Sequence, residues 1–156
     1  MLRRIYYTLL LLGIGLSVAA LLTVGAPKKC SFVQPDGQCV SLEVVTDPVA
    51  HAKGLSGRSS LADNAGMLFV FGQSGVHCFW MKDMRFSIDM VWLNEQLNVV
   101  YVVQDARPES YPASYCPPTT ARYVIEVQAG KSAAMGLVLG RTLSGLDGLE
   151  QKRMID

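Results

Sequence analysis

The chain has 156 residues, of which 50% are hydrophobic and 17% are charged, and this size and composition fit one globular domain. Its 14 basic and 13 acidic side chains leave a formal net charge of +1, and no basic cluster is longer than two residues. Phosphate neutralisation supplies most of the affinity of nucleic-acid binders, so this balance argues against a nucleic acid as partner.

The first predicted element is a hydrophobic segment at residues 5–26, which contains no charged side chain. A helix of about 22 residues crosses a hydrocarbon layer of roughly 30 Å, so residues 1–26 are expected to anchor the chain in a membrane. The short amino-terminal flank favours an orientation with the rest of the chain outside, either periplasmic or on the cell surface. The alternative is a cleaved secretory signal, which would release a secreted protein.

All four cysteines follow this leader, and an even number of cysteines in an exported domain predicts disulfides. The turn signal Pro-Asp-Gly at 35–37 separates Cys30 from Cys39 and would bring their sulfurs together. Cys78 and Cys116 would then pair with each other or remain free. No Cys-x-x-Cys spacing is present, and the sequence therefore predicts neither a metal site nor another cofactor.

Short strands follow, and alternation of apolar and polar residues indicates most of them. The run at 66–71 is instead apolar throughout and bounded by glycine, which predicts a strand buried on both faces. Strands that are close in sequence favour antiparallel pairing. The predicted strands cover residues 38–46, 66–71, 76–81, 88–93, 97–103 and 121–127, with a last short one at 138–143.

Two short helices are expected among these strands. Asp47 is a favourable N-cap and Pro48 suits the first helical position, so a helix is predicted over 49–53, ended by a following glycine. The second is predicted over 129–135 and ends at Gly136. The glycine-rich residues 72–75 form a predicted turn, and the proline-rich residues 107–120 form a predicted long loop.

These elements predict a mainly β (α+β) domain, a small antiparallel β-barrel or sandwich with two short helices. The expected organisation is a leader over 1–26, a linker and turn over 27–38, the globular domain over 39–143, and a polar tail over 144–156.

Several sequence blocks in the predicted domain resemble one known family. They include Gly-Met-Leu-Phe-Val-Phe at 66–71, Phe-Trp-Met-Lys at 79–82, Ile-Asp-Met at 88–90 and Ala-Arg-Tyr-Val-Ile-Glu-Val at 121–127. In order and spacing they resemble the domain of unknown function 192 family over about 42–143. This resemblance implies a small β-rich fold, often on exported or membrane-anchored chains, and it implies no known activity.

Polar residues interrupt the apolar strands around 79–89 and mark the candidate site. Alternation places Trp80 and Lys82 on one strand face, where Arg58 and Lys82 would hold a carboxylate or phosphate beside the indole. The competing interpretation is a buried ion pair between Asp89 and either Arg58 or Lys82, with Trp80 in the core. The candidate ligand-binding residues are Arg58, Trp80, Lys82 and Asp89.

The sequence leaves the molecular function open between three classes. The first is a membrane-anchored binding or accessory module outside the cytoplasm, with the membrane contacted through residues 5–26 and an unknown small ligand or protein as partner. The second is a small hydrolase-like enzyme that uses Asp89 with Glu126 for acid–base chemistry. The third is a protein-interaction scaffold. No nucleophile with a recognisable partner is present, which favours the first class over the enzyme.

Overall fold

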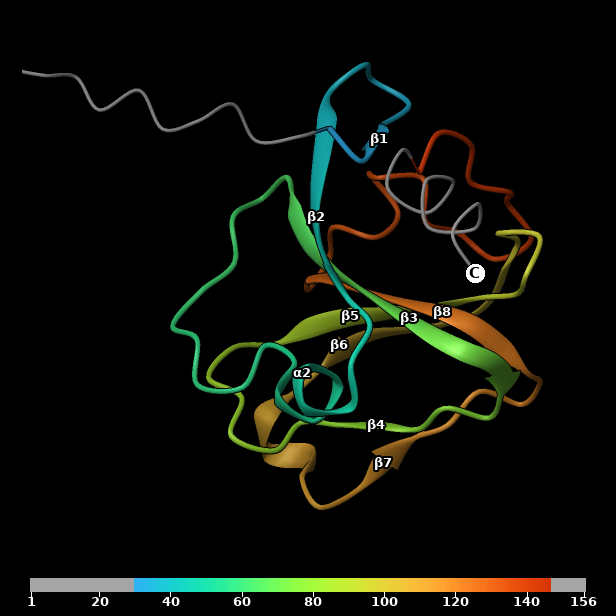
Figure 1. The fold of residues 1–156 in the computed structure, drawn as a ribbon. Coiled ribbons are helices and arrows are strands. Elements are labelled where there is room, and N and C mark those ends of the chain that lie inside the picture. The colour runs from blue at the N-terminus through green and yellow to red at the C-terminus, as the bar shows by residue number, and fades with distance from the viewer. Residues whose placement is uncertain (1–29, 147–156) are drawn as a thin grey trace, which may run out of the picture.

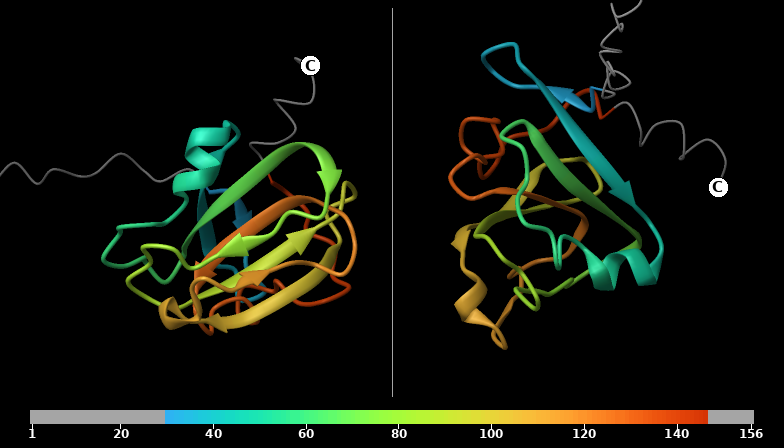
Figure 2. Two further views of the ribbon diagram at one scale, coloured as in Figure 1. Left: turned by 90° about the horizontal axis from the view of Figure 1, so that it is seen from below. Right: turned by 90° about the vertical axis from the view of Figure 1, so that its left-hand side faces the viewer.

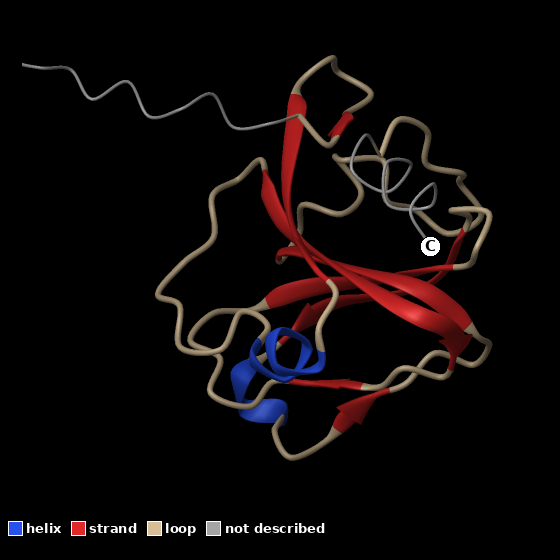
Figure 3. Cartoon of the chain, in the orientation of Figure 1, coloured by secondary structure: helices blue, strands red, loops and turns tan. Residues whose placement is uncertain are grey.

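Strands form most of the regular structure in residues 30–146, which are the residues that the computed structural model describes (Figure 1; Figure 3). The mainly β class predicted from the sequence is confirmed. The elements in chain order are β1 (Phe32–Val33), β2 (Cys39–Val45), α2 (Pro48–Lys53), β3 (Ala65–Gly75), β4 (Phe79–Trp80), β5 (Ile88–Leu93), β6 (Val99–Ala106), the 3-10 helix η1 (Pro108–Ser110), β7 (Ser114–Tyr115) and β8 (Ala121–Gln128).

One six-stranded sheet has the order β1-β2-β3-β8-β5-β6, and β4 and β7 form a separate two-stranded ribbon. The large sheet has β1 and β6 at its two edges, and closure into the predicted barrel or sandwich is not confirmed. β8 lies between β3 and β5, so its residues are far from both sheet edges.

The prediction of antiparallel pairing is wrong for one pair, because β2 and β3 are parallel. Parallel neighbours need a crossover connection of a dozen or more residues, usually with a helix in it. The segment from β2 to β3 is long enough for this crossover and contains α2. β3 then pairs with β8, which is distant in the sequence, rather than with β4.

Both faces of the large sheet are covered. One face carries apolar side chains such as Leu68, Val91 and Ile125, which pack with side chains of β1, β2 and the chain that follows β8. The other face carries Met67, Phe69, Met90, Trp92 and Val124, among others. Figures 1 and 2 show α2 and the β4–β7 ribbon on the same side of the sheet.

The local sequence around α2 explains where this helix begins and ends, and the predicted helix is confirmed. The Asp47 side chain accepts hydrogen bonds from the backbone N–H groups of Val49 (3.1 Å) and Ala50 (2.9 Å). Pro48 is at the first helical position, and Gly54 ends the helix with a φ of 48° that favours glycine.

Three predictions between residues 72 and 120 need correction. The predicted turn at 72–75 belongs to β3, which continues through a register shift between Val70 and Gly75. The predicted strand at 76–81 is reduced to Phe79–Trp80, because its partner is the two-residue β7. That partner and η1 both lie in the predicted loop at 107–120.

The last two predicted elements are turns rather than regular structure. In the predicted helix at 129–135, one helical hydrogen bond joins Met135 N–H to the Lys131 carbonyl, between glycines with positive φ. In the predicted strand at 138–143, Thr142 makes an isolated bridge to Asn98. Gly140, with a φ of 81°, turns the chain there, so a longer ladder does not form.

Two disulfides join the four cysteines. Cys30 and Cys39 are linked across the β1–β2 hairpin with their Cα atoms 5.5 Å apart, as the Pro-Asp-Gly turn predicts. Cys78 and Cys116 are linked next to the β4–β7 ribbon, with a Cα separation of 4.3 Å. The predicted Cys30–Cys39 pair is confirmed, and of the two alternatives left open for Cys78 and Cys116 the structure has the disulfide.

Among residues 30–146 no helix is long and apolar enough to cross a membrane. The predicted anchor at 5–26 lies outside the described residues, as does the predicted tail from residue 147 onward. Leu146, at the end of the described chain, is buried against the sheet.

Candidate functional site

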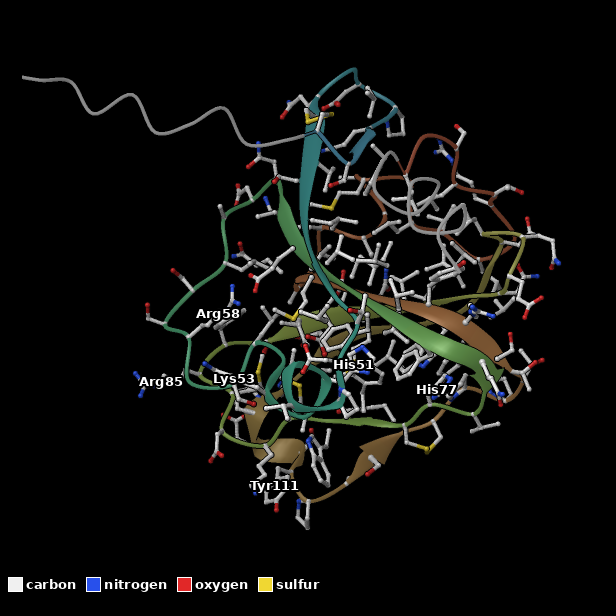
Figure 4. The ribbon with its side chains drawn as sticks, viewed as in Figure 1. His51, Lys53, Arg58, His77, Arg85 and Tyr111 are labelled. Carbon is white, nitrogen blue, oxygen red and sulfur yellow. A yellow bond between two sulfur atoms is a disulfide. The ribbon has the colours of Figure 1, made fainter. Side chains whose placement is uncertain are left out.

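A cavity of about 340 Å³ lies between the end of α2, β4 and the sheet face that α2 covers (Figure 4). We call it the aromatic pocket. Its walls combine aromatic rings with a small number of polar side chains. The lining residues are His51, Ala52, Lys53, Gly54, Leu55, Ser56, Phe69, Phe71, Val76, His77, Cys78, Phe79, Trp80, Met84 and Glu126.

Among residues 30–146, Glu126 contributes the only carboxyl group that lines this pocket. It lies on β8 opposite Met67 of β3 and Met90 of β5, in the middle of the sheet. Glu126 is 4% exposed, and its Oε2 atom has no hydrogen-bond partner in the described part of the chain. Burial raises the pKa of Glu126 from 4.5 to about 8, and the positive charge of Arg58 opposes this rise only in part.

Aromatic rings surround the floor of the pocket. The Phe71 ring stacks on His77 with centroids 3.6 Å apart, and His51 packs against the same ring at 4.7 Å (Figure 4). Phe79 meets Phe69 edge to face at 4.8 Å. The rings therefore pack against one another along the pocket wall.

Trp80 is at the outer part of the pocket, where half of its surface remains exposed. Its indole contacts Tyr111 edge to face at 6.3 Å, and Tyr111 is itself exposed. Two neighbouring exposed aromatic rings give the pocket an apolar outer surface.

Gly54 lets the chain pass close over the floor of the pocket. A Cβ atom at this position would lie 3.3 Å from the Phe69 ring and 3.8 Å from Oε2 of Glu126. The φ of 48° is also unfavourable for other residues. The glycine therefore ends α2, and because it has no side chain it leaves space above Glu126.

The family model that describes "Uncharacterized ACR", DUF192, matches residues 31–145. The chain belongs to the DUF192 family. The resemblance seen in the sequence blocks is thereby confirmed, and the match includes every element from β1 to β8. Among curated proteins, no match to the chain was found.

Two solved structures resemble this DUF192 chain, each with a TM-score of 0.65. The first is a protein from Sinorhizobium meliloti 1021 described as a putative transcription regulator. It shares 28% identity over 72% of this chain and 88% of its own. The second, from Novosphingobium aromaticivorans DSM 12444, is described as a protein of unknown function and shares 22% identity. It covers 72% of this chain and 80% of its own, and it supports the fold alone.

Of the four candidate residues predicted in this DUF192 domain, Trp80 alone lines the aromatic pocket. Arg58 donates to Oε2 of Glu43 at 2.7 Å in an exposed ion pair. Lys82 is exposed, and its backbone carbonyl accepts from Ser56. Trp80 and Lys82 are both exposed, and Met81 between them is buried.

Asp89 lies on the opposite face of the sheet from the pocket. It pairs in register with Val127, whereas Glu126 pairs with Met90, and neighbouring residues on a strand alternate in direction. The Asp89 oxygens accept from the backbone N–H groups of Asp105 (3.0 Å) and Ser132 (3.1 Å). Within residues 30–146 no ion pair joins it to Arg58 or Lys82, and it does not meet Glu126.

The pocket also contains residues that the sequence interpretation did not select. His51 lies on α2, and His77 lies between β3 and β4, which are separate segments whose approach depends on the crossover. Cys78 lines the same pocket but is bonded to Cys116, so its thiol is not available as a metal ligand. The register of the sheet, rather than a local motif, brings these side chains together.

Proposed function

We propose that this domain is a binding module that takes a small molecule with an apolar body into the aromatic pocket. The observation that carries the proposal is Glu126, which lines a ring-lined cavity and whose buried Oε2 atom has no partner among residues 30–146. Ligand pockets usually combine apolar walls with a few polar groups that orient the ligand, and this pocket has that composition.

Energetics support this assignment over a purely structural role for Glu126. A buried carboxyl group without a hydrogen bond costs about 1–3 kcal/mol. A methionine or leucine at this position would avoid that cost, since neighbouring strands place Met67 and Met90 beside it. A polar ligand group that bonds to Oε2 would recover the lost interaction.

We also propose that the module faces the outer side of a membrane. The uncharged segment at 5–26 supports anchoring, and two disulfides support an oxidising compartment. If the leader is cleaved, the same domain would act as a secreted protein.

The other functional classes have less support. Asp89 and Glu126 point to opposite sheet faces, which removes the carboxylate pair on which the hydrolase hypothesis depends. The description of the Sinorhizobium meliloti protein as a putative transcription regulator concerns that protein. Without Arg3 and Arg4, this chain has 12 basic side chains against 13 acidic ones, a balance that does not favour DNA.

The test is a titration of the isotope-labelled domain with benzyl alcohol, a small neutral probe with an apolar ring. We expect saturable NMR shifts at amides of the pocket, including Gly54, Ser56 and Phe79. Replacement of the exposed Trp80 by alanine should weaken binding by roughly five- to tenfold, because the ring contact is lost. Leu139→Ala is the matched control, since Leu139 is also exposed but lies at a separate surface concavity.

Two results would count against a binding module at this pocket. The first is the lack of saturable shifts at millimolar probe. The second is a set of shifts confined to the Leu139 concavity, with equal effects of the two alanine variants. If only a protein captured from the native membrane protects the pocket amides, the scaffold class would replace the small-ligand class.

A further inference from the structure

We propose that the ligand of the aromatic pocket carries a primary ammonium group, which pairs with Glu126 beneath the aromatic rings. This inference rests on the proposed function and adds the chemical class of the ligand. It follows from three features of the pocket: a carboxyl group without a partner among the described residues, cations that are engaged or exposed elsewhere, and walls made of aromatic rings.

No cation in the described part of the chain pairs with Glu126. The positive charge of Arg58 lowers the pKa of Glu126, but its guanidinium is bound to Glu43 at 2.7 Å instead. Lys53 lines the pocket, but its side chain is exposed to solvent. The pocket lining therefore includes a carboxyl group that no cation of the described residues occupies.

The two histidines of the pocket are also engaged with the backbone. Nε2 of His51 lies 3.1 Å from the Val45 carbonyl oxygen, and Nε2 of His77 lies 3.1 Å from the Gln73 carbonyl oxygen. A carbonyl oxygen only accepts, so each Nε2 carries its hydrogen and donates it. These donors are used up, and neither Nε2–H is available to Oε2 of Glu126.

The walls suit a positive charge. The rings of Phe69, Phe71, Phe79 and Trp80 line the same cavity as the carboxyl group. Aromatic faces carry negative electrostatic potential and attract ammonium groups within about 6 Å of the ring centre. A carboxylate at the floor and rings around it are complementary to one ammonium group on an apolar body.

The carboxyl group of Glu126 favours a primary amine over a quaternary ammonium ion, since only the primary amine has N–H groups to donate to its oxygens. Ionisation of Glu126 accompanies binding: the neutral carboxyl group releases its proton to solvent and becomes the carboxylate that faces the ammonium group. With a pKa of about 8 in the empty pocket, most of the carboxyl groups are neutral at pH 7. Binding should therefore release close to one proton per ligand.

The experiment compares benzylamine with benzyl alcohol, which has the same ring without the charge, by calorimetry in two buffers with different ionisation enthalpies. We expect benzylamine to bind at least tenfold more tightly at pH 8 and to release nearly one proton at pH 7. Its affinity should rise by about tenfold per pH unit from pH 6 to 8 and then level off. Benzyl alcohol should show neither proton release nor this pH dependence.

The Glu126→Gln variant should lose the preference for benzylamine and the proton release while it still binds benzyl alcohol. Glu95→Gln is the matched control, because Glu95 is a carboxylate outside the pocket lining, and it should behave as the wild type. Equal binding of both probes to the wild type without proton release would overturn the ammonium assignment and leave the binding module intact. Failure of both probes to bind would remove the proposed function as well.

Discussion

Glu126 makes the stability of the domain depend on pH in an unusual direction. Its folded pKa of about 8 exceeds the ordinary value of 4.5, so between these values the folded state holds a proton that the unfolded state has lost. The free energy of unfolding should fall by roughly 1 kcal/mol per pH unit as pH rises from about 5 to 8, and the decline should stop above 8.

Urea unfolding of the wild type and Glu126→Gln at several pH values measures this contribution. The stability of the wild type relative to the variant should decrease from pH 5 to 8, because glutamine does not titrate. Two curves that stay parallel over this range would show that Glu126 is not held neutral in the folded domain.

Asp89 should behave as a structural residue, in contrast to the exposed Lys82. Asp89→Asn replaces one acceptor oxygen by an amide nitrogen, which leaves a backbone N–H of Asp105 or Ser132 without its partner. We expect a loss of about 1–3 kcal/mol. Lys82→Ala should change stability by less than about 1 kcal/mol, and thermal melts of both variants check this difference. A large loss for Lys82→Ala would restore the buried ion pair as an explanation.

At the residue scale, the burial of Glu126 could not be predicted from the pattern of its own strand. In β8, Tyr123, Ile125 and Val127 form the apolar half of the alternation, which on its own predicts that Glu126 faces solvent. The structure covers that face with α2 and the β4–β7 ribbon. A signal was present in the neighbouring strands: β3 and β5 are apolar on both faces, so a strand paired between them is covered on both faces.

At the scale of elements, the two disulfides should have separable effects. Loop closure in the unfolded chain predicts about 2.7 kcal/mol for the nine-residue separation of Cys30–Cys39 and about 3.9 kcal/mol for the 38-residue separation of Cys78–Cys116. One variant replaces Cys30 and Cys39 by serine, the other replaces Cys78 and Cys116, and each is the control for the other. Urea unfolding measures how much free energy of unfolding each variant loses.

Hydrogen exchange locates these effects within the fold. A two-stranded ribbon is marginal on its own, so loss of Cys78–Cys116 should increase exchange in β4 and β7 and around the aromatic pocket. Loss of Cys30–Cys39 should act on β1 and leave the pocket protected. Equal exchange changes in both regions for both variants would mean that neither disulfide stabilises its element locally.

The elements that sequence predicted correctly are those with a local cause. Alternation indicates β2 and β8, a continuous apolar run indicates β3, and the Asp47-Pro48 pair indicates α2. The misassigned elements depend on distant partners. β7 lies in a proline-rich segment and exists as a strand because β4 pairs with it, and the parallel β2–β3 pair depends on the crossover. The aromatic pocket could not be predicted from local sequence either, because its walls depend on the same distant contacts.

On the scale of the whole molecule, the two faces of the six-stranded sheet differ in what covers them. The face with Leu68, Val91 and Ile125 is a closed apolar core, and Asp89 is satisfied there by backbone donors. The opposite face holds the aromatic pocket and the unpartnered Glu126. Variants on the first face should therefore change stability, whereas variants around the pocket are the ones that should change binding.

The attachment of this molecule to a membrane is tested on the full-length chain. Burial of the uncharged segment at 5–26 is not electrostatic, so the protein should remain in the membrane fraction after washes with high salt and alkaline carbonate. Leu12→Arg with Leu16→Arg is the matched control: each arginine near the centre of the segment costs about 2.5–3.5 kcal/mol, which should release the chain. A soluble wild-type chain that starts near Pro27 would show a cleaved signal in place of the anchor.

The outward orientation has a separate test. Protease added outside cells without an outer barrier should digest the domain, and full protection of the domain would contradict the outward orientation.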